Sequence, residues 1–302
     1  MRMRTLLCVV GGIACALSAA AAGAEVRLTD DNGQEIVLQR PARRIVSLAP
    51  HVTELLFAAG AGERIVGAVD YSDYPEAAKR IPRVGDNRQL DLERIVTLKP
   101  DLIVVWLHGN AQRQLDKLVT LGIPVFYNEP RRLADIARAI RQMGELAGTE
   151  VVAQQAAAEF VAREAKLRAR YGGRAPVRVF YQIWERPLMT VNGRHLISDV
   201  MRLCGGQNVF GELKPLVPTV STEAVLTADP EAIVTAIIDG RVQNGLEAWK
   251  KWPRLTAVAR DNFFYIPTDF ISRHTPRILE GAARICEALD AARTRRPGGA
   301  TP

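Results

Sequence analysis

The sequence predicts an α/β protein in which two sheet-and-helix lobes are joined by a single long spine helix, with a ligand cleft between the lobes. Expected strands and helices alternate along the chain, which is typical of parallel sheets covered by helices on both faces. The stretch from Glu93 to Val104 recurs without gaps from Glu223 to Val234, because both contain glutamate, an apolar pair, threonine, proline, an acid and an apolar run in the same order. Such a repeat indicates two related halves, although a chance likeness between two helix–loop–strand units is the alternative.

The first 24 residues have the features of a signal peptide and not of a folded domain. Arg2 and Arg4 precede an apolar, alanine-rich segment, and residues 22–24 (Ala-Gly-Ala) supply the small side chains of a cleavage site. We therefore expect cleavage before Glu25 and a location in the periplasm. A retained membrane anchor and a lipoprotein site at Cys15 are the alternatives.

Cleavage of the signal peptide would leave two of the four cysteines, Cys204 and Cys286. An even pair in an oxidising compartment predicts a disulfide, here within the second lobe. Two buried free thiols are the alternative.

The distribution of charge does not indicate a nucleic-acid-binding protein. The net charge of the 302-residue chain is +7, and loss of Arg2 and Arg4 lowers it to +5. The remaining basic residues are interspersed with acids, whereas a nucleic-acid footprint gathers them on one face. The basic run at residues 293–296 leads into a short tail, residues 294–302, that we expect to be disordered.

Residues 25–148 are expected to form the N-terminal lobe and residues 174–293 the C-terminal lobe. Residues 26–40 alternate in polarity around Asp31-Asn32-Gly33, which predicts a β-hairpin. The other expected strands are 45–48, 65–69, 101–106, 125–127, 177–183, 232–237 and 263–266, and the expected helices are 53–60, 90–98, 111–121, 133–147, 196–204, 222–227, 246–251 and 276–293.

Residues 149–173 are expected to link the lobes through one long helix. Thr149 can cap its N-terminus, a sequence rich in Ala, Glu, Lys and Arg follows up to Tyr171, and residues 172–173 (Gly-Gly) end it. At 1.5 Å per residue such a helix spans about 34 Å, which is enough to cross a small domain. A helix that packs on one lobe alone is the alternative.

Short motifs of a known family occur through most of the chain, from about Ala42 to Leu289. They are Arg44-Ile-Val-Ser-Leu-Ala-Pro50 with Thr53-Glu54-Leu55, Tyr71-Ser-Asp-Tyr-Pro75, Leu92-Glu-Arg-Ile-Val96 with Lys99-Pro-Asp101-Leu, Trp106 with Gly109-Asn110-Ala111, Cys204-Gly-Gly206 with Asn208, and Thr275-Pro276-Arg277. Together they resemble the periplasmic binding proteins of ATP-driven importers for cobalamin, siderophores and haem. The second and fourth motifs, with the cysteine pair, are more typical of the cobalamin branch.

The resemblance implies a receptor that captures its cargo between two lobes and delivers it to an inner-membrane ABC permease with a cytoplasmic ATPase. It implies no catalysis and no cofactor, because the small molecule, cobalamin or another corrinoid, is cargo. Glu93 and Glu223 match the pair of glutamates with which such proteins dock onto arginines of the permease. The alternative is that each glutamate only stabilises the first turn of its own helix. We expect a monomer.

A corrinoid is a large ring with an apolar plane and a rim of amides, so its site needs aromatic walls and a few hydrogen-bonding groups. Four residues match ligand-contacting positions of the family, three others lie in loops expected to face the cleft, and one histidine begins a helix beside it. In that order they are Tyr71, Trp106, Asp269 and Arg273; Tyr74, Trp184 and Phe270; and His51. Ordinary packing of the aromatic residues, and a plain helix-start role for the histidine, are the alternatives.

Two departures from the family pattern leave the cargo open. Asn87 and Val217 stand where the familiar cobalamin binder has tryptophans. The loss of two flat rings reduces the stacking area. A corrinoid precursor, haem or an iron siderophore is therefore the alternative cargo.

An enzyme is the main competing class of protein. The sequence after residue 24 contains no Gly-rich phosphate loop, no Gly-x-Ser-x-Gly motif and no cluster with metal-ligand spacing. His108, His195 and His274 are scattered along the sequence and do not indicate a zinc site. A periplasmic sensor or chaperone that kept the scaffold but lost transport is a further alternative.

Overall fold

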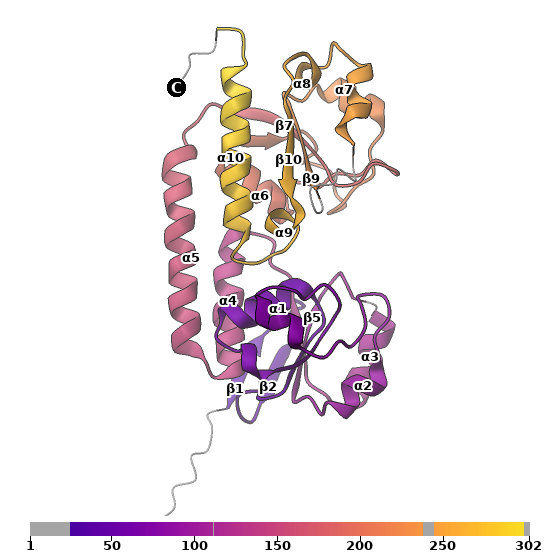
Figure 1. Ribbon diagram of the computed structural model, residues 1–302, viewed down its shortest axis with the longest axis vertical. Coiled ribbons are helices and arrows are strands. Elements are labelled where there is room, and N and C mark those ends of the chain that lie inside the picture. The colour runs from indigo at the N-terminus through magenta and orange to yellow at the C-terminus, as the bar shows by residue number, and fades with distance from the viewer. Residues whose placement is uncertain (1–24, 111, 238–244, 299–302) are drawn as a thin grey trace, which may run out of the picture.

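The computed structural model describes residues 25–110, 112–237 and 245–298, which form two lobes arranged one above the other (Figure 1). Each lobe is a layered α/β unit, so the predicted fold class is confirmed. The predicted signal peptide lies outside the described residues. Within the described ranges, every helix is too short or too polar to traverse a bilayer.

The first lobe contains a hairpin and a parallel sheet. The hairpin pairs β1 (Val26–Thr29) with β2 (Glu35–Leu38) in antiparallel register, as the sequence predicted. The sheet has the order β4 (Ile65–Ala68), β3 (Ile45–Ser47), β5 (Leu102–Trp106), β6 (Val125–Asn128). The helices are α1 (Pro50–Ala58), α2 (Leu92–Thr97), α3 (Gln112–Thr120) and α4 (Leu133–Ala147), with short 3₁₀ turns η1 (Gly62–Arg64) and η2 (Glu76–Arg80).

The second lobe contains a parallel sheet in the order β10 (Phe263–Pro267), β9 (Ala232–Ile237), β7 (Val177–Gln182), β8 (Gly206–Asn208). Its helices are α6 (Leu196–Leu203), α7 (Thr222–Ala228), η3 (Leu246–Lys251), α8 (Thr256–Ala259), α9 (Thr268–Ile271) and α10 (Ile278–Thr294). The sequence did not predict β8, α8 or α9, because β8 has no apolar run and a helix of four residues is too short to show a periodic pattern.

Both lobes have the same strand order. When the four strands of each parallel sheet are numbered in chain order, both sheets have the spatial order 2-1-3-4. All neighbouring strands in the two sheets are parallel. The repeated sequence forms the helix and the third strand in each case, α2–β5 and α7–β9. The residue before the shared proline has a positive φ in both copies, 47° at Lys99 and 39° at Asp229. The repeat therefore corresponds to an equivalent step of the backbone in two equivalent lobes.

The long helix α5 (Glu150–Tyr171) runs beside both lobes (Figure 1). It packs along α4 and reaches α1 in the first lobe and α6 and α10 in the second. Small residues let it approach α4 closely, since Ala153 lies against Gly144. Thr149 does not cap it as predicted; its hydroxyl donates to the carbonyl of Ala59 at 2.7 Å and ties the helix to the end of α1.

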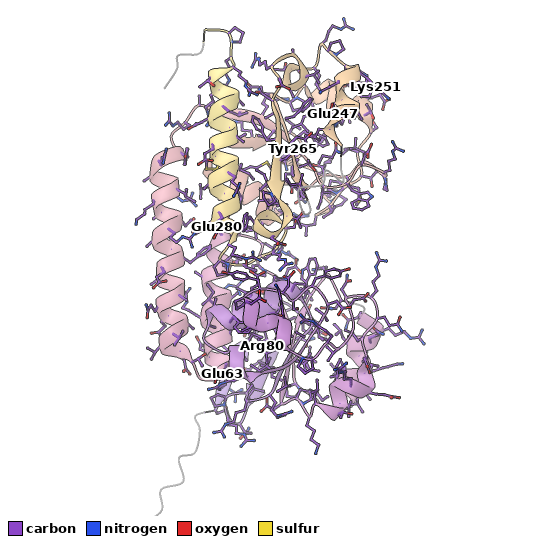
Figure 2. The ribbon with its side chains drawn as sticks, viewed as in Figure 1. Glu63, Arg80, Glu247, Lys251, Tyr265 and Glu280 are labelled. Carbon is purple, nitrogen blue, oxygen red and sulfur yellow. A yellow bond between two sulfur atoms is a disulfide. The ribbon has the colours of Figure 1, made fainter. Side chains whose placement is uncertain are left out.

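One hydrophobic core continues from the first lobe into the second. It includes Leu56 and Val104 on one side, Val179 and Ala282 on the other, and Phe160 of α5 between them. Smaller apolar clusters cover the opposite face of each sheet, and side chains fill each lobe between its sheet and helices (Figure 2). Because close-packed interiors resist deformation, we expect limited motion between the lobes.

Two features of α10 complete the second lobe. Cys204, after α6, and Cys286 of α10 are bonded with an S–S distance of 2.06 Å, so the predicted disulfide is confirmed. Disorder of residues 294–302 stays a prediction, although α10 itself extends to Thr294. Beyond it, Arg296 pairs with Glu231 at 2.8 Å and Arg295 donates to the backbone carbonyl of Asp261, so both side chains contact the second lobe.

Candidate ligand cavity between the lobes

A cavity of about 400 Å³ lies between the lobes, and we call it the ligand cavity. Its walls are formed where strands of both sheets end: the segments after β3 and β4 and the last residue of β5 on one side, and the segment after β10 on the other. Clefts at the carboxyl ends of parallel strands are the usual ligand sites of open α/β sheets. The lining residues are Pro50, His51, Tyr71, Asp73, Trp106, Thr268, Asp269, Ser272, Arg273 and His274.

Two aromatic side chains from the first lobe line this cavity in different ways. Tyr71 is 76% exposed and has a positive φ of 63°, so its ring stands out from the lobe with little packing of its own. Trp106 is partly buried and packs edge-on against His51, with ring centroids 5.5 Å apart. The cavity therefore has one free aromatic surface at its opening and one fixed aromatic surface deeper inside.

Three histidines that are far apart in the sequence gather at this cavity, and we call them the histidine group: His51 and His274, which line its floor, and His195, which packs against His274. The ring of His274 lies 5.7 Å from that of His51 and 5.9 Å from that of His195. His195 and His274 are scattered in the sequence, and the packing of the chain brings their rings together. Among the described residues, no three His, Cys, Asp or Glu side chains are arranged to hold a metal ion.

The histidine group is held in its neutral form by its surroundings. Burial lowers the pKa of His195 to about 3. Burial also lowers the pKa of His274, and burial together with the nearby His274 and Arg273 lowers the pKa of His51 well below its ordinary value. A neutral imidazole has one donor and one acceptor nitrogen, so it can bond to either end of an amide.

Three buried nitrogen atoms around this floor have no hydrogen-bond partner among the described residues: His51 Nε2, Trp106 Nε1 and His274 Nδ1. His51 is 5% and His274 7% exposed. An unpaired buried polar atom costs about 1–3 kcal/mol. Because unpaired groups are rare in native proteins, three at one cavity indicate that a ligand or bound water completes their bonding.

An ionic cluster connects the lobes beside the cavity. Glu54 of α1 is 4% exposed and accepts from Arg273 Nη1 at 3.0 Å and from Arg277 Nη2 at 2.6 Å. Arg273 also contacts Asp73 at 2.7 Å and Asp269 at 3.2 Å. The guanidinium of Arg273, which was expected to contact the ligand, therefore already has three carboxylate partners.

Asp73 and Arg273 of this cluster both remain ionised. Burial works to raise the pKa of Asp73, but the hydrogen bond and charge of Arg273 outweigh it and the pKa is lowered. Burial works to lower the pKa of Arg273, but the bonds to Asp73 and Glu54 leave it raised. Arginine stays charged in proteins in any case. The cavity wall thus carries no cation that lacks an anionic neighbour.

The structure brings five of the eight expected ligand-binding residues to the cavity: His51, Tyr71, Trp106, Asp269 and Arg273. The other three do not line it. The ring of Tyr74 stacks on Arg277 at 3.9 Å, Phe270 lies near Arg277 and Arg284 of α10, and the indole of Trp184 is half-exposed and donates to the carbonyl of Arg186 at 2.9 Å. Ligand contact by these eight side chains stays a prediction.

Sequence reasoning missed two important residues of the wall, Asp73 and His274. Asp73 lies inside the Tyr71–Pro75 motif, and His274 directly precedes Thr275-Pro276-Arg277. The motifs therefore gave a local signal for both. The pairing of His274 with His51 and His195 gave none, because it depends on the packing of the two lobes against each other.

Glu93 and Glu223 occupy equivalent places in the two lobes. Each is exposed in the first turn of a short helix, α2 or α7, and both helices lie on the side of the molecule away from α5 (Figure 1). The N-cap positions are held by Asp91 and Ser221, whose side chains each accept a backbone N–H, at 3.0 and 3.1 Å. The backbone N–H of Glu223 and the Ser221 hydroxyl lower the pKa of the Glu223 carboxyl.

The surroundings of the two glutamates differ in charge. Glu93 borders a hollow of about 580 Å³ whose other acidic residues are Asp70, Asp86 and Asp91. Hydrogen bonds from the backbone of Gln89 and Arg88 lower the pKa of Asp86. The first lobe therefore presents a concave acidic surface, which would suit a basic side chain of a partner.

The chain belongs to the periplasmic binding protein family, whose model matches residues 45–270. A relative in Vibrio cholerae serotype O1, named vitamin B12-binding protein, is 39% identical over 250 residues, which cover 82% of this chain and 90% of the relative. The vitamin B12-binding protein of Yersinia pestis is 38% identical over 248 residues, which cover 82% of this chain and 86% of the relative.

Solved structures give the same fold. The crystal structure of the periplasmic vitamin B12-binding protein BtuF of Vibrio cholerae matches with a TM-score of 0.76 and 38% identity, over 83% of this chain and 98% of that chain. The periplasmic haem-binding protein RhuT from Roseiflexus sp. RS-1 matches with a TM-score of 0.71 over 83% of this chain and 99% of that chain. Its identity is 23%, so this second likeness supports the fold alone.

Proposed function

We propose that this protein is a periplasmic receptor that binds a corrinoid, with cobalamin as the expected ligand, in the cavity between its lobes. The relatives and the solved structure that are named for vitamin B12 support the ligand class. The chemical character of the ligand cavity supports it independently, because its walls are aromatic surfaces, neutral imidazoles and an arginine that already has anionic partners.

Charge distinguishes a corrinoid from the alternative cargoes. The rim of a corrinoid carries uncharged amides, which can bond to the neutral His51 and His274 and to the Trp106 indole N–H. Haem carries two propionates, and ferric catecholate siderophores are strongly anionic. Either would meet Arg273 with Glu54, Asp73 and Asp269 already around it. Burying a carboxylate without a free cation is costly, so the ligand cavity favours the uncharged rim.

Calorimetric titration of the mature protein with cyanocobalamin, cobinamide, haemin and a ferric siderophore tests the ligand class. We expect saturable, tight binding of the corrinoids. Tight binding of haemin or of the siderophore without binding of either corrinoid would reject the assignment. A variant, His274→Phe, keeps a flat aromatic ring and removes the hydrogen-bonding nitrogens, so it should weaken corrinoid binding about tenfold, as expected for one or two lost polar contacts.

Delivery requires a second surface, and the exposed Glu93 and Glu223 supply it. We infer that they dock onto arginines of an inner-membrane ABC permease whose cytoplasmic ATPase drives transport. One exposed ion pair contributes only about 0–1 kcal/mol. Two such pairs on separate lobes fix the orientation of the receptor on its partner. The acidic hollow beside Glu93 is consistent with a basic partner.

The receptor would work in the periplasm as a monomer after removal of residues 1–24. The family to which it belongs and the disulfide between Cys204 and Cys286 support an oxidising, exported location. In this role the protein performs no reaction and needs no cofactor, because the small molecule is cargo and ATP hydrolysis by the partner supplies the energy. A hydrolase assay on the mature protein should show no turnover.

A further inference from the structure

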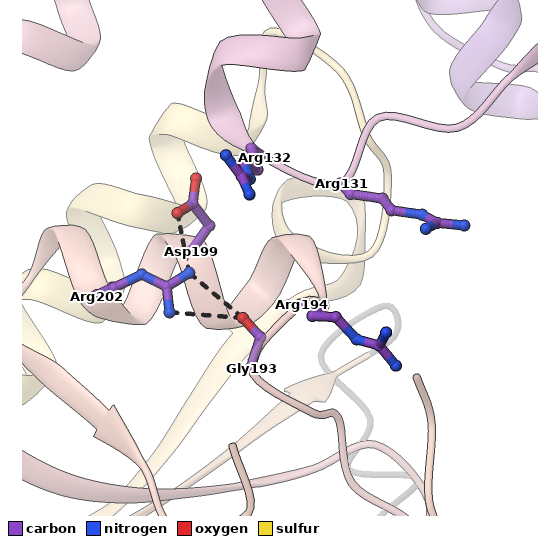
Figure 3. Close-up of a pocket in the computed structure, with 6 residues that line it drawn as sticks. All are labelled: Arg131, Arg132, Gly193, Arg194, Asp199 and Arg202. Atoms are coloured by element: carbon purple, nitrogen blue, oxygen red, sulfur yellow. Dashed lines mark hydrogen bonds and ion pairs between the residues drawn. The ribbon is translucent and has the colours of Figure 1, made fainter. Parts of the chain in front are cut away.

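A second cavity lies where the two lobes meet, and we call it the arginine cavity. Its volume is about 530 Å³. It is formed by the segment that leads into α4 of the first lobe and by the start of α6 in the second (Figure 3). Its lining residues are Arg131, Arg132, Gly193, Arg194, Asp199 and Arg202.

The arginine cavity has a large excess of positive charge. Four guanidiniums line it, against the single carboxylate of Asp199. That carboxylate is already engaged, since it pairs with Arg202 at 3.1 Å and accepts the backbone N–H of Leu133 at 2.9 Å. No carboxylate among the described residues pairs with the side chains of Arg131, Arg132 or Arg194. This is the reverse of the ligand cavity, where the arginine has three acidic neighbours.

The orientation of the side chains leaves two of these arginines, Arg131 and Arg194, without an acidic partner in the described part of the chain, although Arg194 Nη2 donates to the carbonyl of Lys214. Arg202 turns back to Asp199 and to the carbonyl of Gly193 (Figure 3). Arg131 and Arg194 come from different lobes and extend in the same direction in Figure 3. Arginine presents a planar fork of donors that matches the oxygens of a phosphate. A pair of guanidiniums with no acidic partner is therefore suited to an anion of this kind.

The arginine cavity is connected to the ligand cavity through neighbours of the histidine group, of which His51 and His274 line the ligand cavity. Arg194 directly precedes His195, whose ring lies 5.9 Å from that of His274 in the ligand cavity. Arg131 directly follows Pro130, whose carbonyl accepts a hydrogen bond from His274. The two cavities therefore lie on adjoining segments of the chain, which places the arginines on the side of the ligand cavity where His274 lies.

The size of a corrinoid makes such an extension necessary. A cavity of about 400 Å³ is at the lower end of the range for drug-sized ligands, which is roughly 300–1,000 Å³, and a complete corrinoid is larger than those ligands. Part of it must lie outside the ligand cavity. A complete corrinoid also carries one anionic phosphodiester, in the loop that connects its nucleotide base to the ring.

We propose that the arginine cavity is an anion subsite in which Arg131 and Arg194 hold the phosphodiester of the nucleotide loop of a complete corrinoid. This inference depends on the proposed function, and it adds a preference for complete over incomplete corrinoids. Cobinamide has the same ring and amides but lacks the nucleotide base and the phosphodiester. It would use the ligand cavity alone.

The test compares cyanocobalamin with cobinamide by calorimetric titration of the mature protein and of the double variant Arg131→Gln with Arg194→Gln. The dissociation constant of cyanocobalamin should rise about tenfold, as expected for two exposed ion pairs, and that of cobinamide should stay unchanged, since cobinamide has no phosphodiester to place in the arginine cavity. The control is Arg163→Gln with Arg254→Gln, two exposed arginines that are outside both cavities and give the same change in net charge. It should leave both constants unchanged.

Inorganic phosphate distinguishes the loop phosphate from a free anion as occupant. Added at constant ionic strength, it should weaken cyanocobalamin binding to the unaltered protein and not to the double variant. An equal loss for both corrinoids, or no loss for either, would overturn the proposal. So would arginine-dependent binding of haemin through its propionates. If neither corrinoid binds the unaltered protein, the proposed function fails and this inference fails with it.

Discussion

The two copies of the repeated step, α2 to β5 in the first lobe and α7 to β9 in the second, share a backbone but not their surroundings. In each, a short helix with an exposed glutamate is followed by a residue of positive φ, a proline and the third strand of a parallel sheet. Around the first copy, Glu93 borders a concave surface with further carboxylates. Around the second, Asp229 bonds to Thr256 of α8, and the lobe contains the disulfide.

The difference separates what the fold requires from what each lobe adds. The helix, the left-handed residue and the strand build the third strand into each parallel sheet, so both copies keep them. The surface charge beside the glutamate, the hydrogen bonds of Asp229 and the disulfide are not part of this repeated unit, so they differ between the lobes. Changes to the shared glutamates should therefore affect docking, whereas changes to the hydrogen bonds of Asp229 or to the disulfide should affect stability.

The largest effect is expected from the double variant Glu93→Ala with Glu223→Ala, which should abolish uptake while leaving the affinity for ligand in solution unchanged. The single changes should be unequal, because Asp70, Asp86 and Asp91 keep the first lobe negative when Glu93 is removed. Uptake of labelled cobalamin and ligand titration measure the two properties. Glu63→Ala, an exposed acid outside both helices, is the control. Full uptake by the double variant would exclude this docking mode.

Removal of the disulfide tests the ties of the second lobe. Cys204→Ala with Cys286→Ala opens a loop with a sequence separation of 82 residues, so the free energy of unfolding should fall by about 2–5 kcal/mol. Urea unfolding measures the loss. The unaltered protein in reducing agent should show a similar decrease, and the double variant should not respond to the reductant. An unchanged midpoint would mean that the bond does not constrain the unfolded chain.

The buried carboxylate that connects the lobes should have the next largest effect. Glu54→Gln leaves Arg273 and Arg277 without their shared anion in a largely buried site, which should cost about 3 kcal/mol in denaturant unfolding. Asp73→Asn removes a half-exposed partner of the same Arg273, so it should cost at most about 1 kcal/mol. Similar losses for the two variants would show that Glu54 is better hydrated than its burial indicates.

The histidine group should make stability depend on pH. In the folded protein burial lowers the pKa of His51, His195 and His274, and unfolding returns each to its ordinary value of 6.5. Below that pH the unfolded chain binds more protons, so stability is complete above pH 6.5 and falls as the pH decreases, for His195 down to about pH 3. Each histidine contributes a slope of about 1.4 kcal/mol per pH unit.

Denaturant unfolding at about pH 7.5 and about pH 5 measures this dependence. His195 accepts the backbone N–H of Ile197 at 3.1 Å as the N-cap of α6, and asparagine can do the same. His195→Asn should therefore keep the helix and reduce the slope by the contribution of one histidine. A slope that is unchanged in this variant would contradict the assignment of His195 to the titrating group.

Much of the architecture was predictable because it follows from patterns within short stretches of sequence. The alternation of strands and helices, the repeat and the glycine-bounded run before Tyr171 gave the two lobes and α5. The motif around Tyr71 and the strand end at Trp106 gave half of the ligand cavity, since residues that follow parallel strands gather at one edge.

What sequence reasoning missed depends on contacts between lobes. Arg273 and Glu54 are 219 positions apart, and no local pattern shows that they pair. The meeting of His51 with His274 and the gathering of Arg131 with Arg194 have the same origin. The predicted capping role of Thr149 was wrong for a similar reason, because its hydroxyl donates to the distant carbonyl of Ala59 and does not cap α5.

The smallest expected effect gives the sharpest comparison of the two repeated steps. A side chain at positive φ costs about 1–2 kcal/mol per residue, and glycine avoids this cost but loses more entropy on folding. Lys99→Gly changes an exposed side chain, so it should stabilise the protein by about 0.5–1 kcal/mol.

Asp229→Gly removes the same backbone strain but also removes hydrogen bonds to the N–H and hydroxyl of Thr256, at 2.8 and 2.7 Å. Each of those bonds contributes about 1 kcal/mol, so Asp229→Gly should leave stability unchanged or lower it. Urea unfolding of both variants measures the difference. Equal stabilisation would show that the hydrogen bonds between Asp229 and Thr256 of α8 do not stabilise the second lobe.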